Sequence, residues 1–343
     1  MRITRDILLK AARTAVQQRT MRDRHIVCVY LTGSLIDDLP LLGGTADIDL
    51  IFVHDHAPEQ PREILRLTPD VHLDLAHHDQ NIYNQPRELR LNPWVGSNLV
   101  KDPIVLHGTQ HWFEYVQATV FSKFYQPEYV IGRALPMAEK ARQTWLDFQL
   151  DPKDPDPGRV WLYLQAIENA ANALAVLDGA PLTERRFFLQ YPDRVKDLGY
   201  PGMSSGLADL LGKSLPEFKE FKEWQRVWQE SLVLVGKKEN CPISLNPIRF
   251  PYYARAVEAL ASDRMDAALW IVLRTWTQSI LCLPEENEAI TNWQEKLTQI
   301  GMQSSAFQER LNSLDLYLDQ VEEIIEKWAQ NNGLDLNAPI EEV

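Results

Sequence analysis

The chain is poor in cysteine: it has three in 343 residues, and they lie far apart. Cys28, Cys241 and Cys282 are odd in number and include no Cys-x-x-Cys pair. This usage argues against a disulfide framework, which needs paired cysteines in an oxidising compartment. We therefore expect reduced thiols and a cytoplasmic protein.

Long apolar segments are also missing. The longest candidate, residues 267–273, ends at Arg274, well short of the roughly 20 apolar residues that cross a bilayer. The first six residues open an amphipathic pattern and contain no apolar signal region. The sequence predicts no association with a membrane.

Positive charge is the third shortage, with 35 Lys and Arg against 48 Asp and Glu and a net charge of −13. Nucleic-acid binding depends on phosphate contacts to basic side chains, so a nucleic-acid partner is not expected. The acidity is concentrated after residue 120. Such a surface favours a cationic substrate.

Length and composition fit a globular protein with two domains, since 45% of the residues are hydrophobic and 24% charged. Strand patterns stop near residue 120, and helical periodicity dominates from about residue 125. We predict a first domain over residues 1–120, a helical domain over 121–335 and a frayed tail over 336–343. The predicted helices are 4–20, 84–100 with a break at Pro93, 127–150, 159–179, 183–197, 204–213, 216–236, 251–262, 264–281, 286–300 and 304–331.

Two predicted strands and the turn between them organise the first domain. Residues 25–31 form an apolar run rich in β-branched and aromatic residues, and Gly33 and Ser34 follow it directly. After a linker of twelve residues, a second strand begins with Asp47 and Asp49. Because side chains alternate along a strand, both carboxylates point to the same face. Paired carboxylates supply the oxygen ligands that magnesium prefers.

A third carboxylate, Asp74, lies within another predicted strand, residues 71–76, and a fourth strand is predicted over 103–108. If the strand of Asp74 lies beside that of Asp47 and Asp49, three acids share one site. Such a set can hold two divalent ions about 3.5–4 Å apart, as in-line phosphoryl or nucleotidyl transfer requires.

This ordered set resembles the nucleotidyltransferase superfamily with the polymerase-beta-like fold. The shared signature is a Gly-Ser turn (Gly33, Ser34), an Asp-x-Asp strand (Asp47, Asp49) and a later acid on a strand (Asp74). The resemblance covers about residues 1–112, and the order of a core followed by helices is similar to the aminoglycoside-type enzymes. It implies an α+β protein: a mixed sheet with flanking helices, then a larger all-α domain.

The resemblance implies a magnesium-dependent enzyme that moves a nucleoside monophosphate from a nucleoside triphosphate, with ATP as the expected donor, to a hydroxyl of a small molecule. Gly33 and Ser34 would hold the triphosphate, and the three aspartates would hold two Mg²⁺ ions. Asp74 or Glu168 would take the proton of the acceptor hydroxyl. Glu168 lies on a predicted helix rich in small residues; a surface glutamate beside packing asparagines is the alternative interpretation.

The linker after Ser34 departs from the family pattern, because it has no basic residue and carries Asp37 and Asp38. Two alternatives therefore stay open. One is an enzyme that adds AMP to a partner protein, although such enzymes are usually short single domains. The other is a degenerate member that binds a nucleotide or a partner without catalysis.

All eight histidines precede residue 112, and two groups, His54–His56 and His77–His78, follow neighbouring predicted strands near acids. This grouping allows a zinc site. We nevertheless expect all-oxygen ligation in the protein and solvated loop histidines.

Overall fold

The computed structural model describes residues 3–37, 41–108 and 111–336. Its compact units are residues 1–124 with 232–262, and residues 125–231 with 263–343. Residues 232–262 therefore belong to the first unit, although they lie within the span predicted as the helical domain. We call them the return segment. Most of the predicted frayed tail, residues 337–343, lies outside the described residues.

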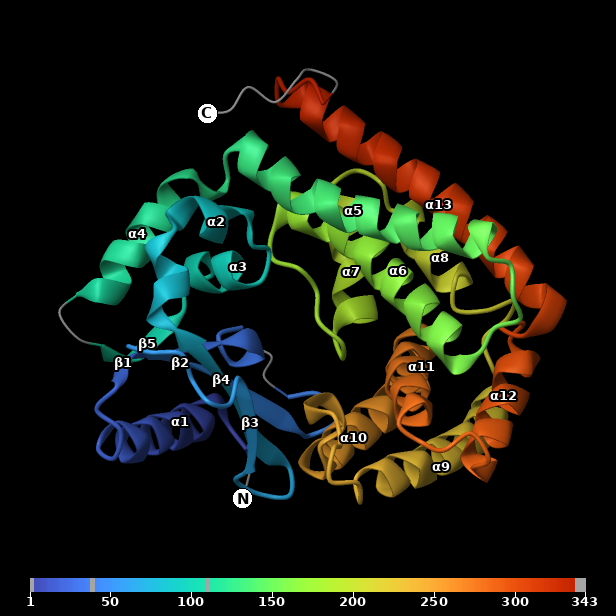
Figure 1. Cartoon of the computed structure of the whole chain (residues 1–343), viewed down its shortest axis with the longest axis horizontal. Helices are drawn as coiled ribbons and strands as arrows, with labels where there is room; N and C mark the ends of the chain where they lie inside the picture. The colour runs from blue at the N-terminus through green and yellow to red at the C-terminus, as the bar shows by residue number, and fades with distance from the viewer. Residues whose placement is uncertain (1–2, 38–40, 109–110, 337–343) are drawn as a thin grey trace. The chain divides into compact units, whose positions relative to one another are not determined.

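The first unit contains a five-stranded mixed sheet, which confirms the α+β class (Figure 1). The strands lie in the order β3-β4-β2-β1-β5. Only β2 and β4 are parallel among the pairs described; the others are antiparallel. The strands are β1 (Ile26–Thr32), β2 (Ala46–His54), β3 (Arg62–Arg66), β4 (Val71–Asp79) and β5 (Ile104–Gly108).

Helices cover both faces of this sheet. On one face α1 (Arg5–Thr20) packs its apolar side against Ile48, Leu50 and Phe52 of β2. On the other face Ile51 and Val53 pack with the short helices that follow β4. These are α2 (Pro86–Leu91), α3 (Val95–Val100) and α4 (Trp112–Phe124).

Two elements of this unit were not predicted, β3 and α4. Strand β3 is an edge strand with exposed Arg62 and Arg66, so it has only one fully buried side chain, Ile64. Too little of it is apolar to show strand periodicity. Helix α4 buries Phe113, Val116, Val120 and Phe124.

The return segment also belongs to the first unit, where it contacts the edge of the sheet. It holds the end of α9 (Phe218–Val235), two 3-10 turns and α10 (Phe250–Leu260). The two turns, residues 243–245 and 247–249, contact edge strand β3.

The second unit is helical, as predicted, and its helix bounds agree with the predictions to within a few residues. Five tryptophans are almost fully enclosed in the protein: Trp224, Trp228, Trp270, Trp276 and Trp293. The helices besides α9 are α5 (Pro127–Leu150), α6 (Pro157–Ala175), α7 (Phe187–Asp197), α8 (Gly202–Asp209), α11 (Met265–Leu281), α12 (Glu288–Gln299) and α13 (Ser304–Asn331).

Candidate functional site

Strand pairing brings the three predicted aspartates together in the first unit. In the parallel pair β2–β4, Asp49 lies opposite Asp74 and Asp47 lies opposite His72. Paired residues of neighbouring strands share a face, so the carboxylates of Asp49 and Asp74 are neighbours and Asp47 is one step along. Burial, and then the charges of Asp47 and Asp74, raise the pKa of Asp49 well above its usual range. The arrangement carries an excess of negative charge.

The turn after β1 touches this carboxylate group. Thr32, the last residue of β1, pairs with Asp49, and Gly33 follows with a φ of +73°. A Cβ atom on Gly33 would lie 1.9 Å from Asp49 Oδ2, so both the backbone conformation and the close approach require glycine. The next residue, Ser34, lies in the middle of a single 3-10 turn, residues 33–35.

Ser34 has a buried hydroxyl oxygen that makes no hydrogen bond within the described part of the chain. A buried hydroxyl without a partner is costly, and ligand binding is one way to satisfy it. The Gly33–Ser34 turn thus combines a backbone close to Asp49 with a buried hydroxyl that has no partner among the described residues.

Arginine, rather than open space, faces Asp74. Arg62 donates from Nε to Asp74 Oδ1 at 2.6 Å and from a terminal nitrogen to Oδ2 at 2.7 Å. A second guanidinium, that of Arg249, lies 3.9 Å from Asp74 Oδ2. The hydrogen bonds to Asp74 raise the pKa of Arg62. Both oxygens of Asp74 are therefore engaged in a bidentate pair.

Arg62 could not be predicted as the partner of Asp74, because β3 was not predicted. Once β3 pairs with β4, Arg62 lies opposite Ala76 and Ile64 opposite Asp74, so Arg62 is one step along the same face. Arg249 could not be predicted for another reason. It lies in the return segment, 175 residues after Asp74.

Tyr252 of the return segment holds the first aspartate. Its hydroxyl donates to Asp47 Oδ2 at 2.5 Å, and its ring packs edge-on against His72 at 4.9 Å between centroids. Arg255, which is on the same helix as Tyr252, α10, forms an ion pair of 3.0 Å with Asp70. Three side chains of the return segment thus bind groups at the start of β2 and β4.

The acidic linker is partly neutralised. Asp37 accepts a hydrogen bond from Lys101 Nζ at 3.0 Å, whereas Asp38 lies outside the described residues. A paired Asp37 adds less negative charge near the Gly33–Ser34 turn than the sequence indicates, because Lys101 carries the opposite charge.

Glu168 belongs to the second unit. It lies on α6, where it forms an ion pair of 2.9 Å with Arg274, and the Arg274 guanidinium stacks 4.4 Å above the ring of Trp161. Burial raises the pKa of Glu168, and the charge of Arg274 opposes that rise. Its side chain is 21% exposed, so the alternative of an ordinary surface glutamate does not describe it. Its role as a base stays a prediction.

The opposite end of β2 carries histidines, and their burial corrects the expectation of solvated loop residues. His54 is only 7% exposed, and its Nε2 lies 2.9 Å from Nδ1 of His77. His78 Nδ1 lies 2.7 Å from the hydroxyl of Tyr83, and burial lowers the pKa of His78 to about 4. These residues remain in strands β2 and β4, which run further than predicted. His56, in contrast, is exposed.

A groove of about 850 Å³ adjoins this histidine end and is bordered by α1 and strands β2 to β4. His54, His56 and His77 line it together with Arg19 and Glu63, which form a bidentate pair. None of the three aspartates lines this groove. The cavity and the acidic group are therefore separate features of the unit.

Asp47 and Asp49 fit a magnesium ion better than Asp74 does. They share a face at the start of β2, and burial, together with the charges of Asp47 and Asp74, raises the pKa of Asp49, an effect that a bound cation would oppose. Asp74 offers no open oxygen while Arg62 binds both. Across the residues described, one group alone places three His, Cys or acid ligand atoms within 4.8 Å of one another, and it is His25, Asp55 and His56. The three aspartates are more widely spaced than that.

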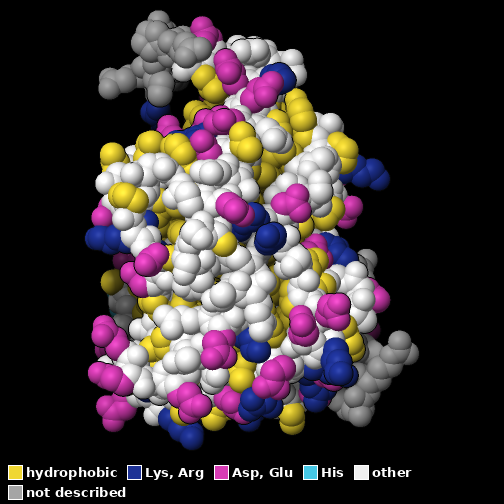
Figure 2. Space-filling view, turned by 90° about the vertical axis from the view of Figure 1, so that its right-hand side faces the viewer, with side chains coloured by type: hydrophobic (Ala, Val, Ile, Leu, Met, Phe, Trp, Pro, Cys, Tyr) yellow, Lys and Arg dark blue, Asp and Glu magenta, His cyan; other side chains and the backbone are white. Residues whose placement is uncertain are grey.

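The face drawn in Figure 2 carries both acidic and basic side chains, as the numbers of charged residues in the sequence lead one to expect. Acidic and basic side chains are interspersed over the described residues of the face drawn in Figure 2. Among the described helices, none combines the length and apolar character that a membrane span requires.

Comparison with known proteins gives no independent identification. No protein-family model matches the chain, and no curated protein matches it significantly. The functional argument therefore depends on the site.

Proposed function

We propose that the protein is a magnesium-dependent nucleotidyltransferase with a polymerase-beta-like core that transfers a nucleoside monophosphate from a nucleoside triphosphate to a hydroxyl of a small molecule. The observation that carries the proposal is the parallel register of β2 and β4. It sets Asp49 opposite Asp74, with Asp47 beside them and the Gly33 turn against Asp49.

In this proposal, the turn residues bind the donor. The backbone of Gly33 comes close to the carboxylates, and the unsatisfied Ser34 hydroxyl is available to hydrogen-bond a phosphate oxygen. Asp47 and Asp49 hold magnesium, which when bound neutralises phosphate charge and lowers the pKa of a hydroxyl.

Asp74 is the proposed base for the acceptor hydroxyl. The hydroxyl oxygen forms a bond to the α-phosphorus, its proton passes to Asp74, and the bond from the α-phosphorus to pyrophosphate breaks. To accept the proton, Asp74 must lose at least one hydrogen bond from Arg62. The released guanidinium can bind a phosphate oxygen, which supplies the positive charge that the linker after Ser34 lacks.

The test is thermal stability of the full chain with ATP, GTP, CTP or UTP, each with and without Mg²⁺. A ligand that binds the native state alone raises the melting temperature by mass action. We expect a magnesium-dependent rise with one nucleotide, ATP first, that disappears in Asp49→Asn. Acceptors are then screened by pyrophosphate release.

The bidentate Arg62–Asp74 pair favours a second candidate, a core that binds a nucleotide without catalysis. In that case the pair stays closed and Asp74 never acts as a base. A nucleotide-dependent rise that is the same with and without Mg²⁺, and no pyrophosphate release with any acceptor, would support this candidate and contradict the enzyme.

A further inference from the structure

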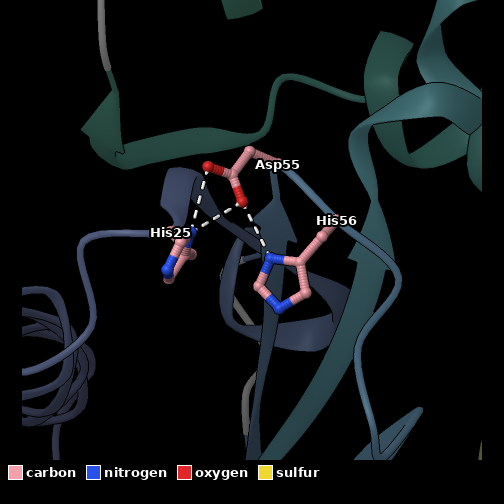
Figure 3. Close-up of side chains that lie close together, drawn as sticks. All are labelled: His25, Asp55 and His56. Carbon is pink, nitrogen blue, oxygen red and sulfur yellow. Dashed lines mark hydrogen bonds and ion pairs between the residues drawn. The ribbon is translucent and has the colours of Figure 1, made fainter.

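Three exposed side chains at the histidine end of the sheet converge on one point (Figure 3). His25 precedes β1, whereas Asp55 and His56 follow β2. His25 Nδ1 lies 3.0 and 3.1 Å from the two oxygens of Asp55, and His56 Nδ1 lies 2.8 Å from Asp55 Oδ1. Both imidazoles therefore direct a nitrogen toward the same carboxylate.

The backbone fixes the positions from which these side chains project. The amide of Asp55 donates to the carbonyl of His25 at 3.0 Å, next to the strand pair Ile26–His54. The amide of His25 in turn donates to Asp23 Oδ1 at 2.9 Å. The three side chains thus stand on the paired ends of two adjacent sheet strands, which hold candidate ligands more firmly than a long loop does.

We propose that His25, Asp55 and His56 form a surface site for a zinc-class transition-metal ion. Two imidazole nitrogens and one carboxylate oxygen are a donor set that suits Zn²⁺, whereas Mg²⁺ prefers oxygen ligands alone. The candidate ligand atoms all lie within 4.8 Å of one another.

The spacing needs only side-chain adjustment to become a coordination shell. Zinc binds nitrogen and carboxylate oxygen at about 2.0–2.2 Å, so a central ion replaces the present hydrogen bonds. The side chains are 65%, 46% and 54% exposed for His25, Asp55 and His56, which leaves them room to turn about the ion. Three protein ligands leave a fourth position for water or another molecule.

This site is independent of the proposed magnesium site. Asp49 and Asp55 are six residues apart along β2 and its exit, which corresponds to about 20 Å in an extended strand. An ion at the histidine end would connect the entry of β1 to the exit of β2 and stabilise the native first unit.

The experiment is a titration of the full chain with ZnCl₂ by calorimetry, alongside Co²⁺, whose visible absorption reports nitrogen coordination. Wild type is compared with His25→Ala, His56→Ala and the double variant. The matched control is His111→Asn, at another histidine that is 93% exposed and lies at a φ of +55°, which asparagine tolerates. All titrations are repeated with MgCl₂.

We expect one Zn²⁺ per chain in wild type and in His111→Asn, and affinity weaker by at least about tenfold in either single alanine variant. Zinc should raise the melting temperature of wild type and not that of the double variant. Equal binding by the double variant, or no stoichiometric Zn²⁺ or Co²⁺ binding by wild type, overturns the proposal and leaves a hydrogen-bonded cluster. Because the readout is zinc binding, it is unaffected if nucleotide binding fails.

Discussion

The two ends of strand β2 place ionisable groups in opposite environments. At its start, Asp47 is buried, Asp49 has a strongly raised pKa, and tyrosine and arginine side chains from distant segments surround them. Just past its end, Asp55 and His56 are exposed and interact with groups that are local or on the adjacent strand.

The difference shows where partners are needed. A buried carboxylate that loses its partners retains the full desolvation cost, whereas an exposed pair exchanges its partner for water. The acidic end therefore has Arg62 and Tyr252 as partners of buried carboxylates, whereas Asp55 at the histidine end interacts with the exposed imidazoles of His25 and His56. Substitutions at the two ends should differ in effect, and we give them in decreasing order.

The largest effect is expected from Asp49→Asn. It removes one magnesium ligand and should lower pyrophosphate release by more than about a hundredfold, since even partners outside the first coordination shell cost 10–100-fold. The same change removes the cost of burying a charged carboxylate and its repulsion from Asp47 and Asp74, so the melting temperature without ligand should rise. Unimpaired transfer by this variant contradicts the proposed site.

Asp49 also gives a pH signature. Its folded pKa is raised, so the folded state binds its proton more tightly than the unfolded state does. Stability is unaffected below the ordinary carboxyl range and falls as pH rises from there to the folded pKa; above it the loss is constant. Relative to Asp49→Asn, wild type should therefore lose melting temperature over this interval. Parallel pH profiles for the two proteins would show that the repulsion is absent.

Arg62→Ala comes next. It leaves Asp74, whose side chain is 2% exposed, with the guanidinium of Arg249 at 3.9 Å. Breaking a buried pair costs 3–5 kcal/mol, and because Arg62 itself is 44% exposed we expect about 2 kcal/mol in urea unfolding. Arg62→Lys keeps the charge without the bidentate geometry and should fall between the two.

Magnesium sharpens the test of Arg62. With both Asp74 oxygens released, Mg²⁺ should raise the melting temperature of Arg62→Ala more than that of wild type. An equal response in the two proteins would indicate that Asp74 does not contribute to a metal site.

Tyr252→Phe should have a smaller effect, a loss of about 1 kcal/mol in unfolding free energy. It removes the hydroxyl that donates to buried Asp47 and keeps the ring that packs on His72. Tyr253→Phe, whose hydroxyl donates to the carbonyl of Ser244, is the matched control on the same helix. The expected distinction is that magnesium-dependent nucleotide binding changes in Tyr252→Phe alone.

The smallest effect is expected at the other end of β2. In metal-free buffer, His56→Ala should leave the melting temperature unchanged, because exposed hydrogen bonds are replaced by water. A clear loss of metal-free stability would show that the histidine end is a structural cluster in its own right and remove the contrast between the two ends.

The sequence was most informative in segments where apolar and polar residues alternate or where apolar residues are consecutive. Strands β1, β2 and β4 were predictable from β-branched runs, and the Asp47–Asp49 pair from the period of two. The site partners were not. Arg62 lies on an edge strand too polar to show periodicity, and Tyr252 on a helix whose sequence has only the signature of amphipathic packing. Side chains that bind a carboxylate from a remote segment leave no local pattern.

The return segment also sets an order of assembly during synthesis. The Tyr252–Asp47 hydrogen bond joins residues 205 positions apart. At about 5–20 residues per second, a ribosome needs roughly 10–40 seconds to add that stretch. For that interval the aspartates of a nascent sheet lack their tyrosine and one of their arginines. The acidic site becomes complete only after the return segment has been made, which couples its formation to the synthesis of residues up to Tyr252.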